Sequence, residues 1–337
     1  MKIFIFRETE LKNLTPEVIE NKGVGGTDSC TVSLASEFAK NGHIVQVSCP
    51  CSYGFYDNVE YIPFTSYGLV RLQIGTFDPD ILIVSGNPQI FLDGPFNVKK
   101  IFFWHHNHPD ELGRFPMHEI LRIPKMIYVF PSIESAEFGK WYYKSDRIAG
   151  VYNGIRSCFF NTTKIKKKDE IVYVGSLTRA KGVLELLKVK EKIPWPVRIC
   201  GGFDMYGFVD ESYKKYCEPY LKDIEMMGTL PPKELASVVA RAQLCIVNPL
   251  IGNKETCCIS ALEAMAVGTC VVAGGNSLID PIIHRGGVTY LNDIPTIISD
   301  LMRMGDVRDN LAIQGKKWVK NITWGNVAKR WEELLFR

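Results

Sequence analysis

Residues 255–272 have the sequence ETCCISALEAMAVGTCVV, and this stretch decides the fold class. An apolar segment of helical character ends at Gly268, and a short apolar strand, residues 269–272, follows at once. A helix joined to a buried strand by a single glycine is the building unit of an α/β sheet protein. The stretch therefore predicts a parallel sheet covered by helices.

Strand-like and helix-like segments alternate in the same way along nearly the whole chain. A first set of predicted strands covers 2–6, 44–48, 81–84, 100–104 and 126–130, with the clearest helix at 28–41. A second set covers 171–174, 197–200, 244–247 and 269–272. Two such sets predict an α/β protein with two doubly wound, Rossmann-like parallel-sheet domains.

The domain boundaries follow from where the apolar pattern stops. We expect a first domain at 1–160, a basic linker at 161–170 and a second domain at 171–318. Trp318, Trp324, Val327 and Trp331 recur at helical spacing, so 319–337 is predicted to be a closing helix that packs back toward the first domain. The lysines at 164 and 166–168 leave a patch for anionic lipid as the alternative to a solvated linker.

Composition excludes several classes of protein. The chain has 337 residues, 46% of them hydrophobic, and its 40 Lys and Arg against 37 Asp and Glu argue against a nucleic-acid partner. The opening apolar run is too short for a secretory signal, and no run approaches the roughly 20 residues that span a bilayer. Ten dispersed cysteines fit a reducing compartment. We expect a cytoplasmic protein, with peripheral contact to a membrane surface left open.

A metal site is not predicted. Cys49-Pro50-Cys51 and Cys257-Cys258 lack the second half of a zinc site, and no histidine stands at ligand spacing to supply it.

Two glutamates in the opening stretch carry chemistry. Glu255 lies in a loop and Glu263 on the helix that starts near Cys258, so both can face one ligand. Free peptide N–H groups at the helix start favour an anion beside Glu255, and Glu263 is placed to accept hydrogen bonds from a ribose diol. An amphipathic helix with one solvated glutamate is the structural alternative.

Two further loops are candidate phosphate sites. Residues 174–182, VGSLTRAKG, leave a strand and open a helix, with Gly175 for close approach and Lys181 as a compact positive charge. In the first domain, Gly25 and Gly26 lie between the first strand and the first clear helix, within reach of a diphosphate. A dinucleotide-binding dehydrogenase is the rival, but the spacing does not match G-x-G-x-x-G.

Histidines follow the fourth strand of the first domain. His105 and His106 stand at the carboxyl edge, where open α/β sheets bind ligands. Strand alternation points neighbouring side chains in opposite directions, so a substrate contact by one of them is favoured over a metal site. His43 is predicted to be structural, at a helix-to-strand turn.

Taken together, these motifs resemble a retaining GT-B glycosyltransferase of glycosyltransferase family 4, also called glycosyl transferases group 1. The resemblance spans essentially the whole chain. It rests on motifs that occur in the family's order: Gly25-Gly26, Gly42-His43-x-Val45, the histidines after the strand, Asn153-Gly154-Ile155, 175–182, 228–231 and the E-x7-E element from Glu255 to Glu263. It implies two domains that face a central cleft, the first on the acceptor side and the second holding the nucleotide sugar.

The resemblance also implies roles for single residues. Glu263 would hold the donor ribose, Lys181 would neutralise the leaving diphosphate, and Glu255 would hold the donor sugar. His106, with His105 as the second choice, would lie beside the transferring sugar. The remaining donor contacts would come from Gly25, Gly26 and Ser176, from Thr229 and Leu230 at the nucleotide base, and from the backbone N–H groups of Thr256, Cys257, Cys258 and Ile259.

This chain departs from the family pattern at two places. Ser176 stands where family members commonly carry arginine, and Arg179 is the candidate to supply the missing charge. Thr256 and Cys257 replace the small glycines usual after the first glutamate.

The implied activity is metal-independent transfer, with retention, from a nucleotide-diphosphate sugar to an acceptor hydroxyl on a glycan, a lipid or a protein. No cofactor beyond this co-substrate is expected. A non-catalytic nucleotide-sugar-binding subunit, or an epimerase or hydrolase of the same fold, is the alternative.

Overall fold

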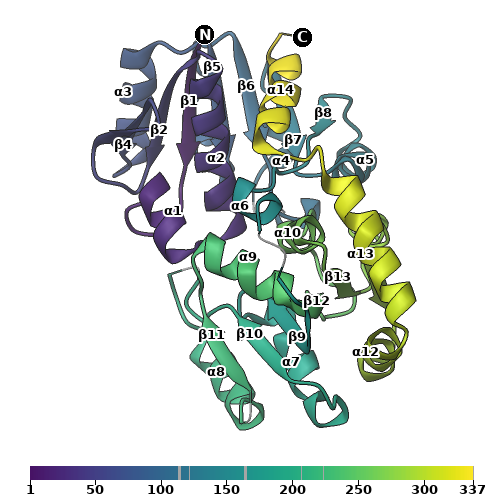
Figure 1. Ribbon diagram of the computed structural model, residues 1–337. Coiled ribbons are helices and arrows are strands. Elements are labelled where there is room, and N and C mark those ends of the chain that lie inside the picture. The colour runs from purple at the N-terminus through teal and green to yellow at the C-terminus, as the bar shows by residue number, and fades with distance from the viewer. Residues whose placement is uncertain (113–114, 121, 163–164, 206, 223, 337) are drawn as a thin grey trace. The chain divides into compact units, whose positions relative to one another are not determined.

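The computed structural model describes residues 1–112, 115–120, 122–162, 165–205, 207–222 and 224–336 (Figure 1). These residues form two compact units. Unit 1 comprises Met1–Ile19, Gly25–Gly154 and Trp324–Arg337, and unit 2 comprises Glu20–Val24 and Ile155–Thr323.

Unit 1 is built on one large sheet with the strand order β3-β4-β2-β1-β5-β6-β7-β8. All neighbouring strands are parallel except β3 and β4, which form an antiparallel pair at one edge. The strands are β1 (Lys2–Arg7), β2 (Ile44–Cys49), β3 (Gly54–Tyr56), β4 (Val59–Pro63), β5 (Ile81–Ser85), β6 (Lys100–Trp104), β7 (Met126–Phe130) and β8 (Ile148–Gly150).

The helices of this part of the chain are α1 (Pro16–Lys22), α2 (Gly26–Lys40), α3 (Tyr67–Phe77), α4 (Met117–Ile120), α5 (Ile133–Tyr143) and α14 (Trp324–Leu335). Helix α1 crosses from unit 1 into the short segment Glu20–Val24 that belongs to unit 2. Figure 1 shows α14 beside α2, and the two helices are in contact.

Unit 2 has a fully parallel sheet with the strand order β11-β10-β9-β12-β13-β14. Its strands are β9 (Lys168–Val174), β10 (Val197–Cys200), β11 (Glu225–Gly228), β12 (Ala242–Val247), β13 (Cys270–Gly274) and β14 (Gly287–Tyr290). Its helices are α6 (Ser157–Phe160), α7 (Val183–Leu187), α8 (Glu211–Cys217), α9 (Pro232–Arg241), α10 (Ile259–Val267), α11 (Asp280–Ile283), α12 (Ile294–Arg303) and α13 (Gly305–Val319).

The order of the strands locates the ligand-binding edge of unit 2. The chain runs from β9 outward through β10 to β11, then returns to place β12 on the other side of β9. Open α/β sheets bind ligands beyond the carboxyl ends of the strands, at the point where the order reverses. For unit 2 that point lies between the loop after β9 and the loop after β12.

Each predicted strand is present, and the α/β class with two parallel-sheet domains expected from the sequence is confirmed. The central strands were identifiable because they are continuous apolar runs buried on both faces. Strand β4 and the four edge strands β3, β8, β11 and β14 were not predicted.

The predicted basic linker at 161–170 needs correction. Strand β9 starts at Lys168, inside the predicted linker. Lys167 is also part of the fold, because its ammonium donates to the carbonyl of Ala242 at 2.7 Å and to Thr269 Oγ1 at 3.0 Å. A solvated linker or a lipid-binding patch does not fit Lys167, while Lys164 lies outside the described residues.

The closing helix predicted for 319–337 is present as α14, which belongs to unit 1, but Trp318 is not part of it. Helix α13 ends at Val319 and a new helix, α14, begins at Trp324, so Trp318 belongs to the first helix and only the later residues to the second. Within unit 1, the fully buried Trp331 packs edge-on against Trp104, with ring centres 5.1 Å apart. His43, at the turn before β2, bonds Glu332 of α14 at 3.2 Å and so has the structural role expected for it.

Within the described part of the chain, no helix combines the length and the apolar character needed to cross a membrane.

Gly182 provides a test of the packing in unit 2. Its φ is +69°, and a Cβ there would lie 2.4 Å from the Leu250 Cβ and 2.6 Å from the Leu250 nitrogen. Gly252 has the same φ but no atom within 4 Å of such a Cβ, so it is a matched control. We expect Gly182→Ala to lower the free energy of unfolding by roughly 2–4 kcal/mol and Gly252→Ala by roughly 1 kcal/mol, measured by urea denaturation. Equal effects in the two variants would contradict this packing.

Candidate active site

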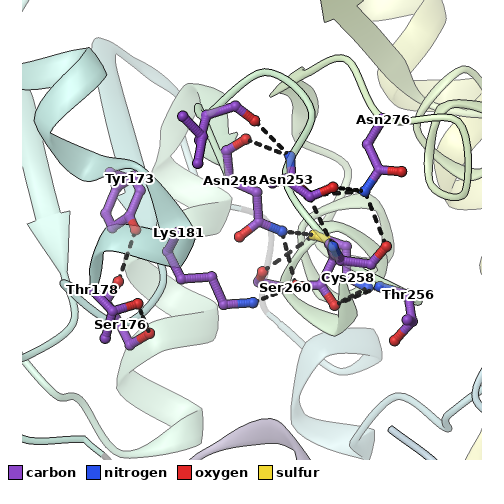
Figure 2. A network of polar contacts seen from close by, with 12 residues as sticks. Tyr173, Ser176, Thr178, Lys181, Asn248, Asn253, Thr256, Cys258, Ser260 and Asn276 are labelled. Carbon is purple, nitrogen blue, oxygen red and sulfur yellow. Dashed lines mark hydrogen bonds and ion pairs between the residues drawn. The ribbon is translucent and has the colours of Figure 1, made fainter. Parts of the chain in front are cut away.

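Two loops of unit 2 meet at the point where the strand order reverses. The loop after β9 carries Lys181, and the loop after β12 carries Glu255. The two side chains form an ion pair through Lys181 Nζ and Glu255 Oε2. Figure 2 shows the Lys181 side chain extending toward the loop that holds Asn248 and Cys258. The two residues that the sequence singled out for the diphosphate and the sugar are therefore brought together.

The Glu255 carboxylate is an acceptor for donors from several parts of the loop. Oε2 accepts from Lys181 and from Asn248 Nδ2, the latter at 3.0 Å. Oε1 accepts from the backbone N–H groups of Thr256 at 3.1 Å and Cys258 at 3.2 Å. A carboxylate has about four lone-pair positions, so Glu255 is fully hydrogen-bonded in this conformation. A sugar hydroxyl can bond Glu255 only by replacing one of these donors.

These contacts decide the ionisation of Glu255. Burial alone would raise the pKa of this carboxyl, but the charge of Lys181 and the two backbone N–H groups outweigh burial and lower the pKa from 4.5 to about 2. Glu255 is therefore a carboxylate at neutral pH, and it is part of a fixed charge arrangement rather than an acid that could donate a proton.

The start of α10 requires a correction to the predicted donor contacts. The backbone N–H groups of Thr256 and Cys258 were expected to bind the donor, but both are donated to Glu255. Cys258 adopts φ +53° immediately before α10, and Glu255 accepts from the turn that precedes the helix rather than from the helix itself. Among the predicted set, the N–H of Ile259 has no hydrogen-bond partner in the described part of the chain. Cys257 is buried beside them.

The helix ends as predicted. Gly268 has φ +81° and closes α10 in the left-handed conformation, directly before β13.

The loop after β9 is held mainly by hydrogen bonds, because the helix that follows it, α7, is short. Helix α7 has only five residues and follows the 3-10 turn Arg179–Lys181, so the second helix start expected beside the diphosphate is a single turn. Tyr173 donates to the carbonyl of Ser176 at 3.0 Å, and Ser176 is buried with its hydroxyl 3.5 Å from that of Thr178. Gly175 precedes this turn directly after the strand.

Arg179 is close to Lys181 in sequence, but its guanidinium binds other partners, at the start of α8. Its Nε pairs with Asp210 at 3.0 Å and its Nη2 donates to Ser212 at 2.8 Å. The guanidinium also lies over the Tyr213 ring, 5.0 Å from its centre. Arg179 is thus committed to the start of α8, and it supplies the charge missing at Ser176 only if these contacts break.

Three asparagines that sequence analysis missed hold the loop in shape (Figure 2). Asn253 donates to the carbonyl of Leu250 at 2.8 Å and accepts from the N–H of Glu255 at 3.1 Å. Asn276 donates to Asn253 Oδ1 at 3.0 Å and to the Glu255 carbonyl at 3.1 Å. Asn248 follows β12 with φ +42°, and an asparagine directly after a strand was the available signal for this role.

Glu263 lies on α10 and is paired with an arginine that sequence analysis also missed. Arg156 donates to Glu263 Oε1 from Nε at 3.2 Å and from Nη2 at 3.0 Å. Burial raises the pKa of Glu263, and the charge and hydrogen bonds of Arg156 oppose that rise. The pair keeps a buried carboxylate on the second glutamate of the E-x7-E element.

The residues expected at the nucleotide base lie after β11. Gly23, from the short segment that joins unit 2, has φ +64°, and a Cβ there would lie 2.3 Å from the Leu230 carbonyl oxygen and 3.3 Å from a Thr229 methyl group. A glycine is therefore required beside this turn. Gly25 and Gly26 belong to unit 1, where they begin α2.

The two histidines point in opposite directions within unit 1, as strand alternation predicts. His105 is 1% exposed, its ring lies against those of Phe103 and Phe130, and burial lowers its pKa to about 3. A ligand cannot reach this ring without opening the core, so His105 is a poor candidate for a donor contact. His106 is half-buried, and its Nε2 is 3.3 Å from Ser85 Oγ at the end of β5.

Burial, together with the charge of Arg7, lowers the pKa of His106 well below its usual range, so the ring is neutral near pH 7. Across the described residues, no cluster of three or more His, Cys, Asp or Glu side chains could hold a metal ion.

Comparison with known proteins agrees with this geometry. Residues 156–302 match the family model described as glycosyl transferases group 1. Sucrose-phosphate synthase from Thermosynechococcus elongatus superposes with a TM-score of 0.78 at 15% identity, covering 99% of this chain and 98% of that one. HepE from Anabaena, solved in complex with UDP-glucose, superposes with a TM-score of 0.77 at 12% identity. The match covers 100% of this chain and 99% of HepE. No curated protein matches the sequence of this chain.

A third solved structure, WaaG, a glycosyltransferase involved in lipopolysaccharide biosynthesis, gives a TM-score of 0.72 at 12% identity and covers 99% of each chain. Likenesses at this level of identity define the fold, and that fold is GT-B. The matched segment, residues 156–302, is a glycosyl transferases group 1 domain, and this domain supports a glycosyltransferase activity.

The low pKa of Glu255 predicts how stability depends on pH. Because the folded pKa, about 2, lies below the unfolded value near 4.5, the carboxylate stabilises the fold above about pH 4.5 and loses that contribution as the pH falls toward 2. We expect Glu255→Gln to lower the free energy of unfolding at pH 7 by roughly 3 kcal/mol. The difference from wild type should shrink below pH 4.5 in urea denaturation.

Glu185→Gln is the matched control for this experiment. Glu185 pairs with Lys188 on the exposed surface of α7, and exposed pairs contribute little. A Glu255→Gln variant that matches Glu185→Gln at pH 7 would show that the Lys181 contact does not stabilise the fold.

Proposed function

We propose that the protein is a retaining, metal-independent glycosyltransferase of family 4, which moves a sugar from a nucleotide-diphosphate sugar to an acceptor hydroxyl. The observation that carries the proposal is the ion pair of Lys181 and Glu255 between the loops after β9 and β12, inside the group 1 domain. A positive side chain at the strand-order reversal of a parallel sheet is where a diphosphate binds in this class of fold.

In the proposed donor site, Lys181 and Glu255 bind the donor from the positions that they occupy in the structure. The diphosphate competes with Glu255 for the Lys181 ammonium, so donor binding exchanges one partner of that ion pair for another. The released Glu255 oxygen then accepts from a sugar hydroxyl, while Asn248 and the N–H groups of Thr256 and Cys258 keep the carboxylate in position. Glu263 accepts from the ribose, and Thr229 and Leu230 border the base.

The proposed chemistry needs no side chain as nucleophile. The developing negative charge falls on the leaving diphosphate, and Lys181 stabilises it in a site shielded from water. The departing phosphate oxygen takes the proton of the acceptor hydroxyl, which attacks the same face of the sugar. His106, neutral near pH 7, is the residue of unit 1 proposed to contact the transferring sugar.

The identity of the donor is proposed from the relatives. HepE was solved with UDP and with UDP-glucose, so uridine nucleotides are the first donors to test. The acceptor is proposed to be a glycan, a lipid or a protein-linked sugar, and the enzyme to act in the cytoplasm, with peripheral membrane contact where the acceptor is a lipid.

One observation favours the second candidate, a non-catalytic nucleotide-sugar-binding subunit. Ser176 replaces the usual arginine and Arg179 is held by Asp210, so a single lysine faces the diphosphate from this loop. Nucleotide-sugar binding without transfer to any of a broad set of acceptors would support that candidate.

Replacing Lys181 tests its role in transfer. We expect Lys181→Ala to lower the rate of sugar transfer by about 10²–10³-fold, because one preorganised charge on the leaving group is lost. The rate is measured with UDP-glucose and an acceptor panel, in buffer with a chelator. Lys188→Ala, which removes an exposed charge from α7, should leave the rate unchanged. An unchanged rate in Lys181→Ala with an intact fold would remove Lys181 from the mechanism.

The stereochemistry of the product tests the mechanism independently. Attack from the face that the diphosphate leaves predicts the same anomeric configuration in the product as in the donor. Proton NMR of the first product formed, before mutarotation, measures this through the anomeric coupling constant. An inverted product would overturn the retaining mechanism.

A further inference from the structure

The ion pair between Arg156 and Glu263 has an unusual one-sided geometry. Both donors of Arg156 bond the same carboxylate oxygen, Oε1, at 3.2 and 3.0 Å. The second oxygen, Oε2, receives no hydrogen bond from any residue in the described part of the chain, and it is not among the enclosed polar atoms that lack a partner. One oxygen is thus occupied by the arginine and the other is left accessible to a ligand.

Backbone hydrogen bonds hold the chain at Arg156, whose carbonyl accepts from the N–H of Phe159 at 3.1 Å. The preceding residue, Ile155, donates its N–H to the carbonyl of Ile322 at 2.8 Å and forms a β-bridge with Thr323. The guanidinium also lies 5.4 Å from the ring centre of the fully buried Phe159 on α6, which contacts α10. Arg156 is therefore held independently of Glu263, and it can impose an orientation on the carboxylate.

The pair also determines the charge that a ligand meets. The Glu263 side chain is 7% exposed and that of Arg156 is 16% exposed. Burial by itself favours the neutral carboxylic acid, and the adjacent guanidinium opposes it. A carboxylate oxygen only accepts hydrogen bonds, and the hydroxyls of a ribose diol can donate them. A 2′-deoxyribose has one such hydroxyl fewer.

We propose that Arg156 is a positioning residue of the donor site: by holding Glu263 Oε1, it aims Oε2 at the ribose hydroxyls and makes the site select ribonucleotides over 2′-deoxyribonucleotides. This inference rests on the proposed function. Arg156 does not touch the nucleotide, so its effect passes through Glu263.

The test compares affinities for UDP and 2′-deoxy-UDP, measured by titration calorimetry on the full chain. We expect wild type to prefer UDP by about tenfold, the value of one hydrogen bond near 1.4 kcal/mol. Glu263→Gln and Arg156→Gln should each reduce this preference to about twofold or less. The double variant should be no less selective than either single variant, because both changes remove the same contact.

Two more variants separate positioning from stability. Arg156→Lys keeps the charge but cannot donate twice to one oxygen, so it should retain only part of the preference. Arg241→Gln breaks another buried ion pair of unit 2, in which Arg241 Nε lies 2.6 Å from Glu170 Oε1. That pair lies at the start of β9, away from the strand ends that form the donor site, and the control should keep the full preference.

Each outcome decides the inference. Full selectivity in Arg156→Gln, or in Arg156→Lys where the glutamine variant does not fold, overturns it and leaves the proposed function standing. Equal binding of UDP and 2′-deoxy-UDP by wild type also overturns it. If wild type binds neither UDP nor any other nucleoside diphosphate, the proposed function fails and the inference fails with it.

Discussion

The structure of the candidate site in unit 2 depends on one ion pair, between Lys181 and Glu255. The two residues come from loops after β9 and β12, which lie next to each other because the strand order reverses there. Each charge makes the burial of the other tolerable, since a lone buried charge is costly. The residue before α10, Cys258, takes a left-handed conformation and donates its N–H to Glu255.

The asparagines around this pair explain why the loop can be both polar and ordered. Asn253 and Asn276 satisfy backbone groups that no strand or helix reaches, and Asn248 donates to the Glu255 carboxylate. A buried loop is stable only when such groups are paired. The result is a loop whose polar groups are already paired, so the proposed ligand would not have to order it. Preorganisation of this kind lowers the cost of stabilising charge on a leaving group.

The second glutamate works by a different principle. Glu263 sits on a helix, where its backbone is fixed by the helix itself, and Arg156 occupies one of its oxygens. Glu255 is saturated by four donors, whereas Glu263 is bonded on one side only. The E-x7-E spacing thus joins a carboxylate tied into the loop to a carboxylate with an accessible oxygen.

The family resemblance led to the expectation that Lys181 and Glu255 share one site. The sequence by itself determined the two-sheet class, the central strands and the end of α10 at Gly268. It could do so because buried parallel strands are continuous apolar runs, and glycines, charges and helix ends are local signals. Only the tertiary structure decided the partners: Arg156 for Glu263, Asp210 for Arg179, and Glu255 for the N–H groups expected to bind the donor. Those contacts join residues 31 to 107 positions apart, or depend on backbone angles such as that of Cys258, and no local pattern encodes them.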